Sequence, residues 1–232
     1  MRISTKSPKN KMIVGIAAAA VLALPLAACS SGSDSGSSNS GSSSSSASKP
    51  EVAKPAAQVD ALTGEDTAVK LDQGFVDALG TLKLTPGVVG DAELTDGSLI
   101  FPITGGNVSY FKPGTASPYV IGQIQHEGSG FSLTAGDTKV ELENFNVDPG
   151  SSKLYGDVSV NGKSAVKNAY LFQLDGRTLK PLQTGENDTA ILEGTEVKIS
   201  EVAAPLLNDT FKTDAVEPGL LVGVATITVN TK

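Results

Sequence analysis

The sequence predicts a mainly β fold, an antiparallel sandwich or barrel-like domain with two short helices. Short apolar runs of four to nine residues recur at spacings near ten, and glycine, asparagine or aspartate clusters separate them. Apolar and polar residues alternate within several runs, most clearly over residues 139–147. Because alternate side chains of a strand point to opposite faces, this pattern predicts a sheet with one face in contact with water.

Ten segments carry the strand pattern, and one turn between them is especially informative. Asn161-Gly162 follows the run 153–160 and is the strongest hairpin signal in the chain. The expected strands cover residues 88–94, 98–103, 108–111, 119–126, 131–134, 139–147, 153–160, 169–174, 190–199 and 220–229.

Two segments have helical spacing instead. Residues 72–82 place Phe75 and Leu79 on one face, and Asp72 stands where a capping side chain would accept hydrogen bonds from the first turn. Residues 200–211 also carry an apolar stripe, although Pro205 favours a late start for this helix.

The first 28 residues have the pattern of a secretory leader, with a basic start followed by an apolar run over residues 12–24. The run ends at Leu26-Ala27-Ala28-Cys29, which resembles the bacterial lipobox. This resemblance implies that Cys29 is acylated, becomes the mature N-terminus and anchors a lipoprotein to the outer face of the cell membrane. The alternative is an ordinary signal peptide or membrane-spanning anchor with an incidental cysteine.

A low-complexity tether follows over residues 29–58. Residues 30–48 contain 13 serines and 3 glycines among 19 residues, a composition that cannot bury apolar surface and so predicts disorder. The globular domain is therefore expected over residues 59–232.

Charge and cysteine content exclude several functions. The chain has a net charge of −7, and without the four basic leader residues 14 basic residues face 25 acidic ones, a net charge of −11. No basic face is available for nucleic acid. One cysteine and one histidine exclude an internal disulfide and a zinc site of several Cys and His ligands, and no metal site is predicted.

Three side chains are candidate ligand-binding residues. His126 ends the expected strand 119–126 beside a Gly-Ser-Gly turn, where it could act as a ligand, or could simply lie at the surface. Tyr110 and Tyr119 occupy strand positions, where aromatic residues also serve packing. No Gly-x-Ser-x-Gly elbow or phosphate loop occurs, so no catalytic residue is assigned and the domain is predicted not to be an enzyme.

Several segments of the domain together resemble a known family. Phe-Pro-Ile-Thr-Gly-Gly at 101–106, Gly-Gln-Ile-Gln-His-Glu-Gly at 122–128, Leu133, Val140 and Leu-Tyr-Gly-Asp-Val at 154–158 are similar to the actinobacterial haem-uptake surface domain of the HtaA type. This resemblance implies a β-rich secreted or anchored domain.

The resemblance also implies a haem site, from which this chain departs. The family is thought to bind haem through a tyrosine three residues after a phenylalanine in its opening segment, with a supporting histidine in the glycine-rich turn. Counted from Phe75, the tyrosine position falls on Ala78, whereas the histidine position matches His126. His126 is the one functional residue that carries over.

Three functions remain open at this point. The leading hypothesis is a membrane-anchored, non-enzymatic binding domain for a cell-envelope or small-molecule partner of unknown identity. The alternative is binding of haem or another hydrophobic small molecule for uptake. A hydrolase that uses loop carboxylates is the third and weakest hypothesis.

Overall fold

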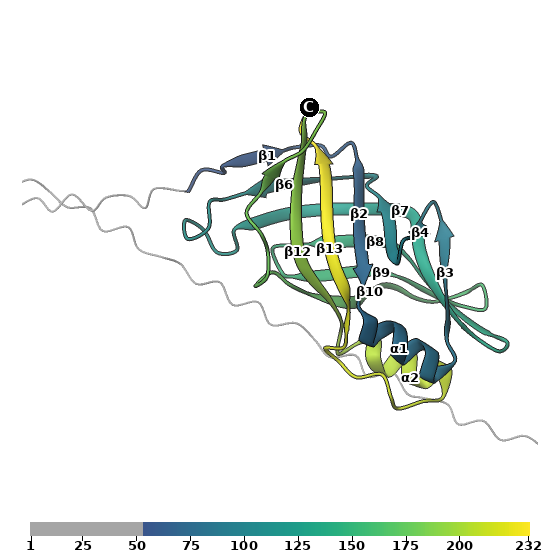
Figure 1. Ribbon diagram of the computed structural model, residues 1–232. Coiled ribbons are helices and arrows are strands. Elements are labelled where there is room, and N and C mark those ends of the chain that lie inside the picture. Colours follow the sequence, from purple (N-terminus) through teal and green to yellow (C-terminus); the bar gives the residue numbers. More distant parts are fainter. Residues whose placement is uncertain (1–52) are drawn as a thin grey trace, which may run out of the picture. The chain divides into compact units, whose positions relative to one another are not determined.

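The structure, a computed structural model, describes residues 53–232. The predicted leader, Cys29 and the serine-rich part of the tether lie outside these residues. The described part forms one curled antiparallel sheet with two short helices at one end (Figure 1). The predicted fold class is confirmed, and the curled sheet is closer to an open barrel than to a sandwich.

The sheet has thirteen strands in the described part of the chain, in the order β1-β6-β7-β8-β9-β10-β12-β13-β2-β5-β4, with β3 paired to β7 and β11 to β12. The strands are β1 (Ala57–Val59), β2 (Glu65–Leu71), β3 (Thr85–Gly90), β4 (Glu93–Thr95), β5 (Ser98–Pro102), β6 (Gly105–Tyr110), β7 (Val120–Ala135), β8 (Thr138–Asp148), β9 (Lys153–Val160), β10 (Lys163–Asp175), β11 (Gln183–Thr184), β12 (Thr189–Ile199) and β13 (Leu221–Asn230).

Strand β7 corrects the prediction of two strands separated by a turn at residues 127–130. It continues from Val120 to Ala135, and only its register on β8 shifts, between His126 and Gly130. The first half of β7 pairs with β6 and the second half with β3. The glycine-rich segment is therefore a bulge that bends the strand without ending it.

Two other differences concern short strands. The run predicted at residues 88–94 is divided between β3 and β4, and the break between them is held by the Asp91 amide, which donates to the Gly128 carbonyl over 3.1 Å. Strand β2 was not predicted, although it alternates inward residues such as Thr67 and Val69 with outward ones. It pairs with β13 and β5 and so brings the start of the domain beside its end.

Helices α1 (Gln73–Leu82) and α2 (Ala203–Phe211) lie together at one end of the curled sheet (Figure 1). Asp72 caps α1 as predicted, since its Oδ1 accepts from the Gly74 amide at 2.8 Å. Helix α2 starts late, as Pro205 suggested, and the Ser200 hydroxyl accepts from the Ala203 amide at 2.9 Å. Both helices bury their apolar faces against the sheet.

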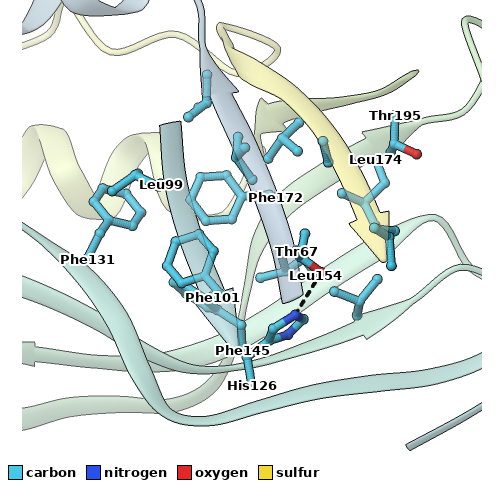
Figure 2. A pocket seen from close by; sticks show the side chains of 16 residues that line it. Thr67, Leu99, Phe101, His126, Phe131, Phe145, Leu154, Phe172, Leu174 and Thr195 are labelled. Carbon is cyan, nitrogen blue, oxygen red and sulfur yellow. Dashed lines mark hydrogen bonds between the residues drawn. The ribbon is translucent and has the colours of Figure 1, made fainter. Parts of the chain in front are cut away.

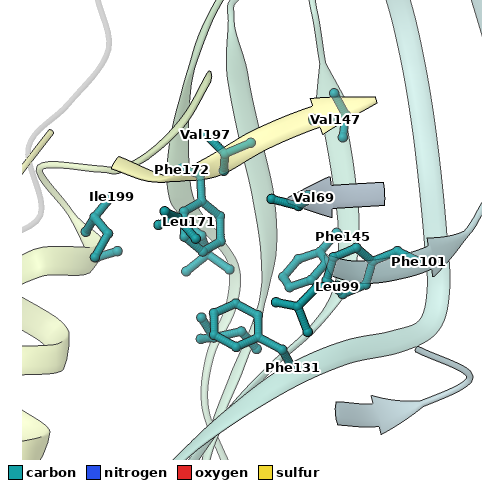
Figure 3. Packing of buried hydrophobic residues seen from close by; sticks show 14 of the residues in the cluster. Val69, Leu99, Phe101, Phe131, Phe145, Val147, Leu171, Phe172, Val197 and Ile199 are labelled. Carbon is teal, nitrogen blue, oxygen red and sulfur yellow. The ribbon is translucent and has the colours of Figure 1, made fainter. Parts of the chain in front are cut away.

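Four phenylalanines fill the middle of the interior, and we call Phe101, Phe131, Phe145 and Phe172 the phenylalanine layer (Figure 3). Phe145 is central, because its ring lies 5.3 Å from that of Phe101, 6.4 Å from Phe131 and 6.3 Å from Phe172 between centroids. The helices cover the interior on one side of this layer. The loops before β7 and after β10 border it on the other side.

Candidate functional site

His126 lies in the middle of β7 and points into the interior, beside the phenylalanine layer (Figure 2). Only 2% of its surface is exposed. Its Nε2 atom is 2.9 Å from the Thr67 hydroxyl of β2, and its ring meets Phe101 edge-on with centroids 6.3 Å apart. The expectation of a strand end or a surface position is wrong, because the bulge continues the strand and β2 and β5 cover the ring.

The surroundings of His126 keep its imidazole neutral. Burial lowers the pKa of His126 to about 4, against a smaller opposing effect from the Phe145 backbone. Within residues 53–232, Nδ1 nevertheless has no hydrogen-bond partner of good geometry. The space beside the ring is a cavity of about 50 Å³ with apolar walls. Such a volume admits no more than a few water-sized groups, so His126 is packed as a core residue.

Ala78, the position that the resemblance assigns to a tyrosine, lies elsewhere. It borders a separate gap of about 20 Å³ between α1 and α2, together with Phe75, Leu79 and Leu207. His126 does not border that gap. It borders a different cavity, which lies on the far side of Phe131 and Phe172 from the helices. The structure therefore does not bring these two positions into one cavity.

Tyr110 and Tyr119 lie next to each other at the other end of the interior. The β6–β7 hairpin pairs Tyr110 with Val120, and this register places the two rings perpendicular with centroids 6.1 Å apart. Burial raises the pKa of the Tyr119 hydroxyl, and Tyr110 adds to this effect. The Tyr119 phenol is therefore expected to be neutral at physiological pH.

The two tyrosines border the tyrosine cavity, an opening of about 280 Å³. Its walls come from the inner faces of β6, β7, β8, β12 and β13 and from the loops at 111–119 and 176–182. Besides the tyrosines, its principal walls are Val108, Val120, Ile124, Val147, Leu174, Leu179, Leu182, Leu192, Ile227 and Val229.

The chemistry of this lining is simple. It contains aliphatic side chains, two prolines, a few hydroxyls and the two phenols, and no carboxylate, amine or imidazole. Such walls can bind an apolar molecule but offer no general base with a pKa near neutrality. Sequence reasoning found the tyrosines but missed Leu179 and Leu182, whose apolar character in an otherwise polar loop was the available signal.

Two of the carboxylates considered for a hydrolase, Asp157 and Asp175, are occupied by ion pairs. Asp175 accepts from Arg177 and from Lys198 at 2.9 Å, and these cations hold the pKa of its carboxyl far below the usual range. Asp157 is paired with Lys167 at 2.7 Å. Among residues 53–232 no group of three or more His, Cys, Asp or Glu side chains is arranged to hold a metal ion.

Neither described helix is long and apolar enough to cross a membrane. Comparisons with known proteins find no matching protein-family model and no matching curated protein. The chain does resemble solved structures from Corynebacterium glutamicum. The C-terminal domain of HtaA matches with a TM-score of 0.49 and 14% identity over 75% of this chain and 96% of that one. The haem-binding protein HtaB matches at 0.43 and 13% identity, over 75% of this chain and 96% of that one.

The N-terminal domain of HtaA has a TM-score of 0.42 and 11% identity, over 73% of this chain and 99% of that one. The two HtaA domains are of the same type as the family that the sequence resembles. At such low identities and TM-scores the likeness determines neither ligand nor site, which depend on the side chains described above.

Proposed function

We propose that the domain is a non-enzymatic binding module that takes up an uncharged, apolar small molecule in the tyrosine cavity. The observation that carries this proposal is an open space of about 280 Å³ with an almost wholly apolar lining. Small-molecule sites commonly occupy about 300 to 1,000 Å³, so the cavity suits a compact ligand or one end of a longer one. Binding would remove these apolar walls from water and so be favourable.

The charge of the chain and the lining of the cavity disfavour a charged ligand, because the lining has no carboxylate to pair with a cation. The cavity lining has no cation that could pair with an anionic group, and the expected mature chain is strongly acidic. An anion would lose hydration on entry without gaining a partner. The two phenol hydroxyls can instead make hydrogen bonds with a single neutral polar group on the ligand.

Haem, which the sequence resemblance implies, does not fit the described residues through His126. Iron needs an axial donor with open approach. The Nε2 atom of His126 lies against Thr67, and the adjacent cavity of about 50 Å³ is too small for a porphyrin. Ala78 supplies no donor atom. Haem coordination at the family's two positions is therefore not part of the proposed function.

The proposal includes a lipid anchor at Cys29, on the outer face of the cell membrane. The lipobox resemblance and the serine-rich stretch after it support an anchored, extracytoplasmic domain that can reach molecules near the cell surface. A Cys29→Ser variant tests this part, because a serine has no thiol to acylate. We expect loss of labelling by a fatty-acid analogue, and continued labelling would contradict the anchor.

Binding can be tested with N-phenyl-1-naphthylamine, a neutral fluorophore whose emission rises in apolar surroundings. Ala190 borders the tyrosine cavity, so Ala190→Phe would fill it, and the matched control His126→Gln changes the neighbouring closed region. We expect Kd to rise at least about tenfold in the first variant and to stay within about twofold in the second.

Equal binding by wild type and Ala190→Phe, with both folded by circular dichroism, would overturn the proposal. A parallel haemin titration has its own expected result. Any Soret shift of haemin should be the same with wild type and with His126→Gln. A shift that wild type shows and His126→Gln lacks would restore the haem hypothesis.

A further inference from the structure

The outer face of the sheet carries a row of four side chains that the proposed cavity does not involve. Gln125 of β7 pairs with Asn146 of β8, Asn146 with Tyr155 of β9, and Tyr155 with Tyr170 of β10. The neighbours in sequence, such as Ile124, Val147 and Leu154, line the interior. Strand alternation therefore directs all four outward. At about 4.8 Å between strands, the row spans about 14 Å.

A polar hollow of about 540 Å³ opens at the amide end of this row. Its walls include Gln125, Asn144, Asn146, Asp157 and Asn168. The hollow exists because the register of β8 on β9 shifts between Glu143 and Asn146, opposite the bulge of β7. Bulges are common beside binding sites because they redirect side chains.

Hydrogen bonds fix the walls of the hollow. The Gly128 amide donates to the Asn144 side chain at 2.9 Å, the Asn144 amide group donates to Asp157 at 3.2 Å, and the Asn168 backbone amide donates to Asp157 at 3.0 Å. Lys167 donates to the same carboxylate at 2.7 Å. A preorganised set of polar groups loses little entropy when a ligand binds.

Asn146 is the unsatisfied member of the set. Its Oδ1 atom is buried from solvent and has no hydrogen-bond partner among the described residues. A buried acceptor without a donor destabilises the protein. Asn146 lies between Gln125 and Tyr155 and lines the hollow, so a turn of its side chain would bring Oδ1 to a ligand hydroxyl there.

The aromatic end of the row complements the hollow. The rings of Tyr155 and Tyr170 are partly exposed and lie 5.9 Å apart with a tilt of 46°. The Tyr170 hydroxyl donates to Gln173, and Lys153 lies 4.7 Å from the Tyr170 ring centroid. Both interactions hold this ring, while Tyr155 stands next to Asn146 and presents an apolar ring with a polar tip.

We propose that this outer face binds a neutral oligosaccharide. A sugar ring has an apolar C–H surface that can lie on an aromatic side chain, and hydroxyls that both donate to and accept from amide groups. Tyr155 supplies the first kind of contact, and the side-chain amides of Gln125 and Asn146 supply the second. Carboxylates around the hollow disfavour acidic sugars, because like charges repel.

The site is independent of the tyrosine cavity, because the two lie on opposite faces of the same strands. It would let the domain hold envelope glycan on the outside while an apolar molecule occupies the inside. Failure of one site would leave the other unaffected.

The test is binding of the full chain to an array of neutral and acidic oligosaccharides, followed by titration with the strongest neutral one. We expect binding to neutral oligosaccharides, with Kd raised at least about tenfold by Tyr155→Ala and by Asn146→Ala. Tyr155→Phe keeps the ring and should bind within about threefold of wild type. Val166→Ala, at an exposed position of β10, is the surface control.

Three results would overturn the proposal. They are no binding to any neutral oligosaccharide, binding confined to acidic ones, or binding that both alanine variants retain. Ala190→Phe separates this site from the cavity, because it should lose the naphthylamine probe and keep the sugar. Loss of sugar binding in Ala190→Phe would place the sugar in the cavity instead.

Discussion

The phenylalanine layer and the tyrosine cavity occupy the same interior, yet one is filled and the other is open. They share walls at Val147, Leu174, Thr195 and Ile227. Beside His126 the free volume is about 50 Å³, whereas the cavity that Tyr110 and Tyr119 border has about 280 Å³. The difference arises from the groups that lie against the inner face of the sheet. In the first region they are four phenylalanines, and in the second they are two loops with smaller side chains.

This contrast shows why the most reactive residue type is not the best functional candidate here. His126 is the single histidine of the chain, and its ring serves packing and one hydrogen bond. The tyrosines have less reactive side chains but border the space that a ligand can enter. Access, more than chemical type, distinguishes the two regions.

Removing the centre of the filled region should have the largest effect. Phe145→Ala deletes a ring that contacts three other phenylalanines, and we expect a loss of about 3 to 5 kcal/mol in the free energy of unfolding. Urea unfolding measures this value. A loss below about 1 kcal/mol would show that the layer is not closely packed, and would remove the contrast with the tyrosine cavity.

The titration of His126 should give the next largest effect. Its pKa is about 4 in the folded state and 6.5 in the reference state, so the unfolded chain takes up a proton first as pH falls. The contribution of neutral His126 to the free energy of unfolding is fully present above about pH 6.5. As the pH falls from there to about 4, up to about 3 kcal/mol of this contribution is lost.

A His126→Gln variant isolates this contribution, because carboxylates titrate in both proteins. We expect its free energy of unfolding to vary less between pH 7 and pH 4.5 than that of the wild type. Identical pH profiles for the two proteins would mean that the imidazole is solvated, against the buried position described above.

Gly156 tests the packing of the filled region by the addition of a side chain, where Phe145→Ala removes one. A methyl group there would lie 2.8 Å from both Phe145 Cδ1 and Leu171 Cδ1. Gly156→Ala should therefore overpack the filled region and cost about 1 to 3 kcal/mol. Thermal unfolding measures the change. Gly162→Ala is unsuitable as a control, because the positive φ of +73° at this position would strain an alanine. Gly80→Ala meets no atom within 4 Å and is the matched control.

The smallest effect should come from the rim of the tyrosine cavity. Lys180 and Glu193 form an exposed ion pair at 2.6 Å, next to Leu179 and Leu192 of the cavity wall. The loop is also held by the Thr178 hydroxyl, which donates to the Gly194 carbonyl at 2.7 Å. Lys180→Ala should change stability by less than about 1 kcal/mol and leave probe binding within about twofold. A tenfold loss of probe affinity would make the ion pair a determinant of the cavity shape.

Local signals in the sequence were sufficient for much of the fold. Asn161-Gly162 forms the β9–β10 turn, and Asp72 caps α1, because both features depend on a few adjacent residues. The break predicted at residues 127–130 was wrong, since whether glycines end a strand or form a bulge depends on β3 and β8 beside them. Those neighbours are distant in sequence.

The site was less accessible to sequence reasoning for the same reason. The alternation of Ile124 and His126 is consistent with a buried histidine, but its cover comes from β2 and β5, of which β2 was not predicted. Tyr110 and Tyr119 meet through a single hairpin and were identified as candidates. The walls contributed by Leu192 and Val229 follow only from the curling of the sheet.

The central claim is that a ligand enters the open region and leaves the filled one unchanged. Methyl NMR of the leucine and valine side chains during titration with N-phenyl-1-naphthylamine tests it most directly. We predict large shifts at Leu179, Leu192 and Val229, with Leu99 and Val69 beside His126 unaffected. Shifts centred on Leu99 and Val69 would contradict the account, because they would place the ligand against the histidine.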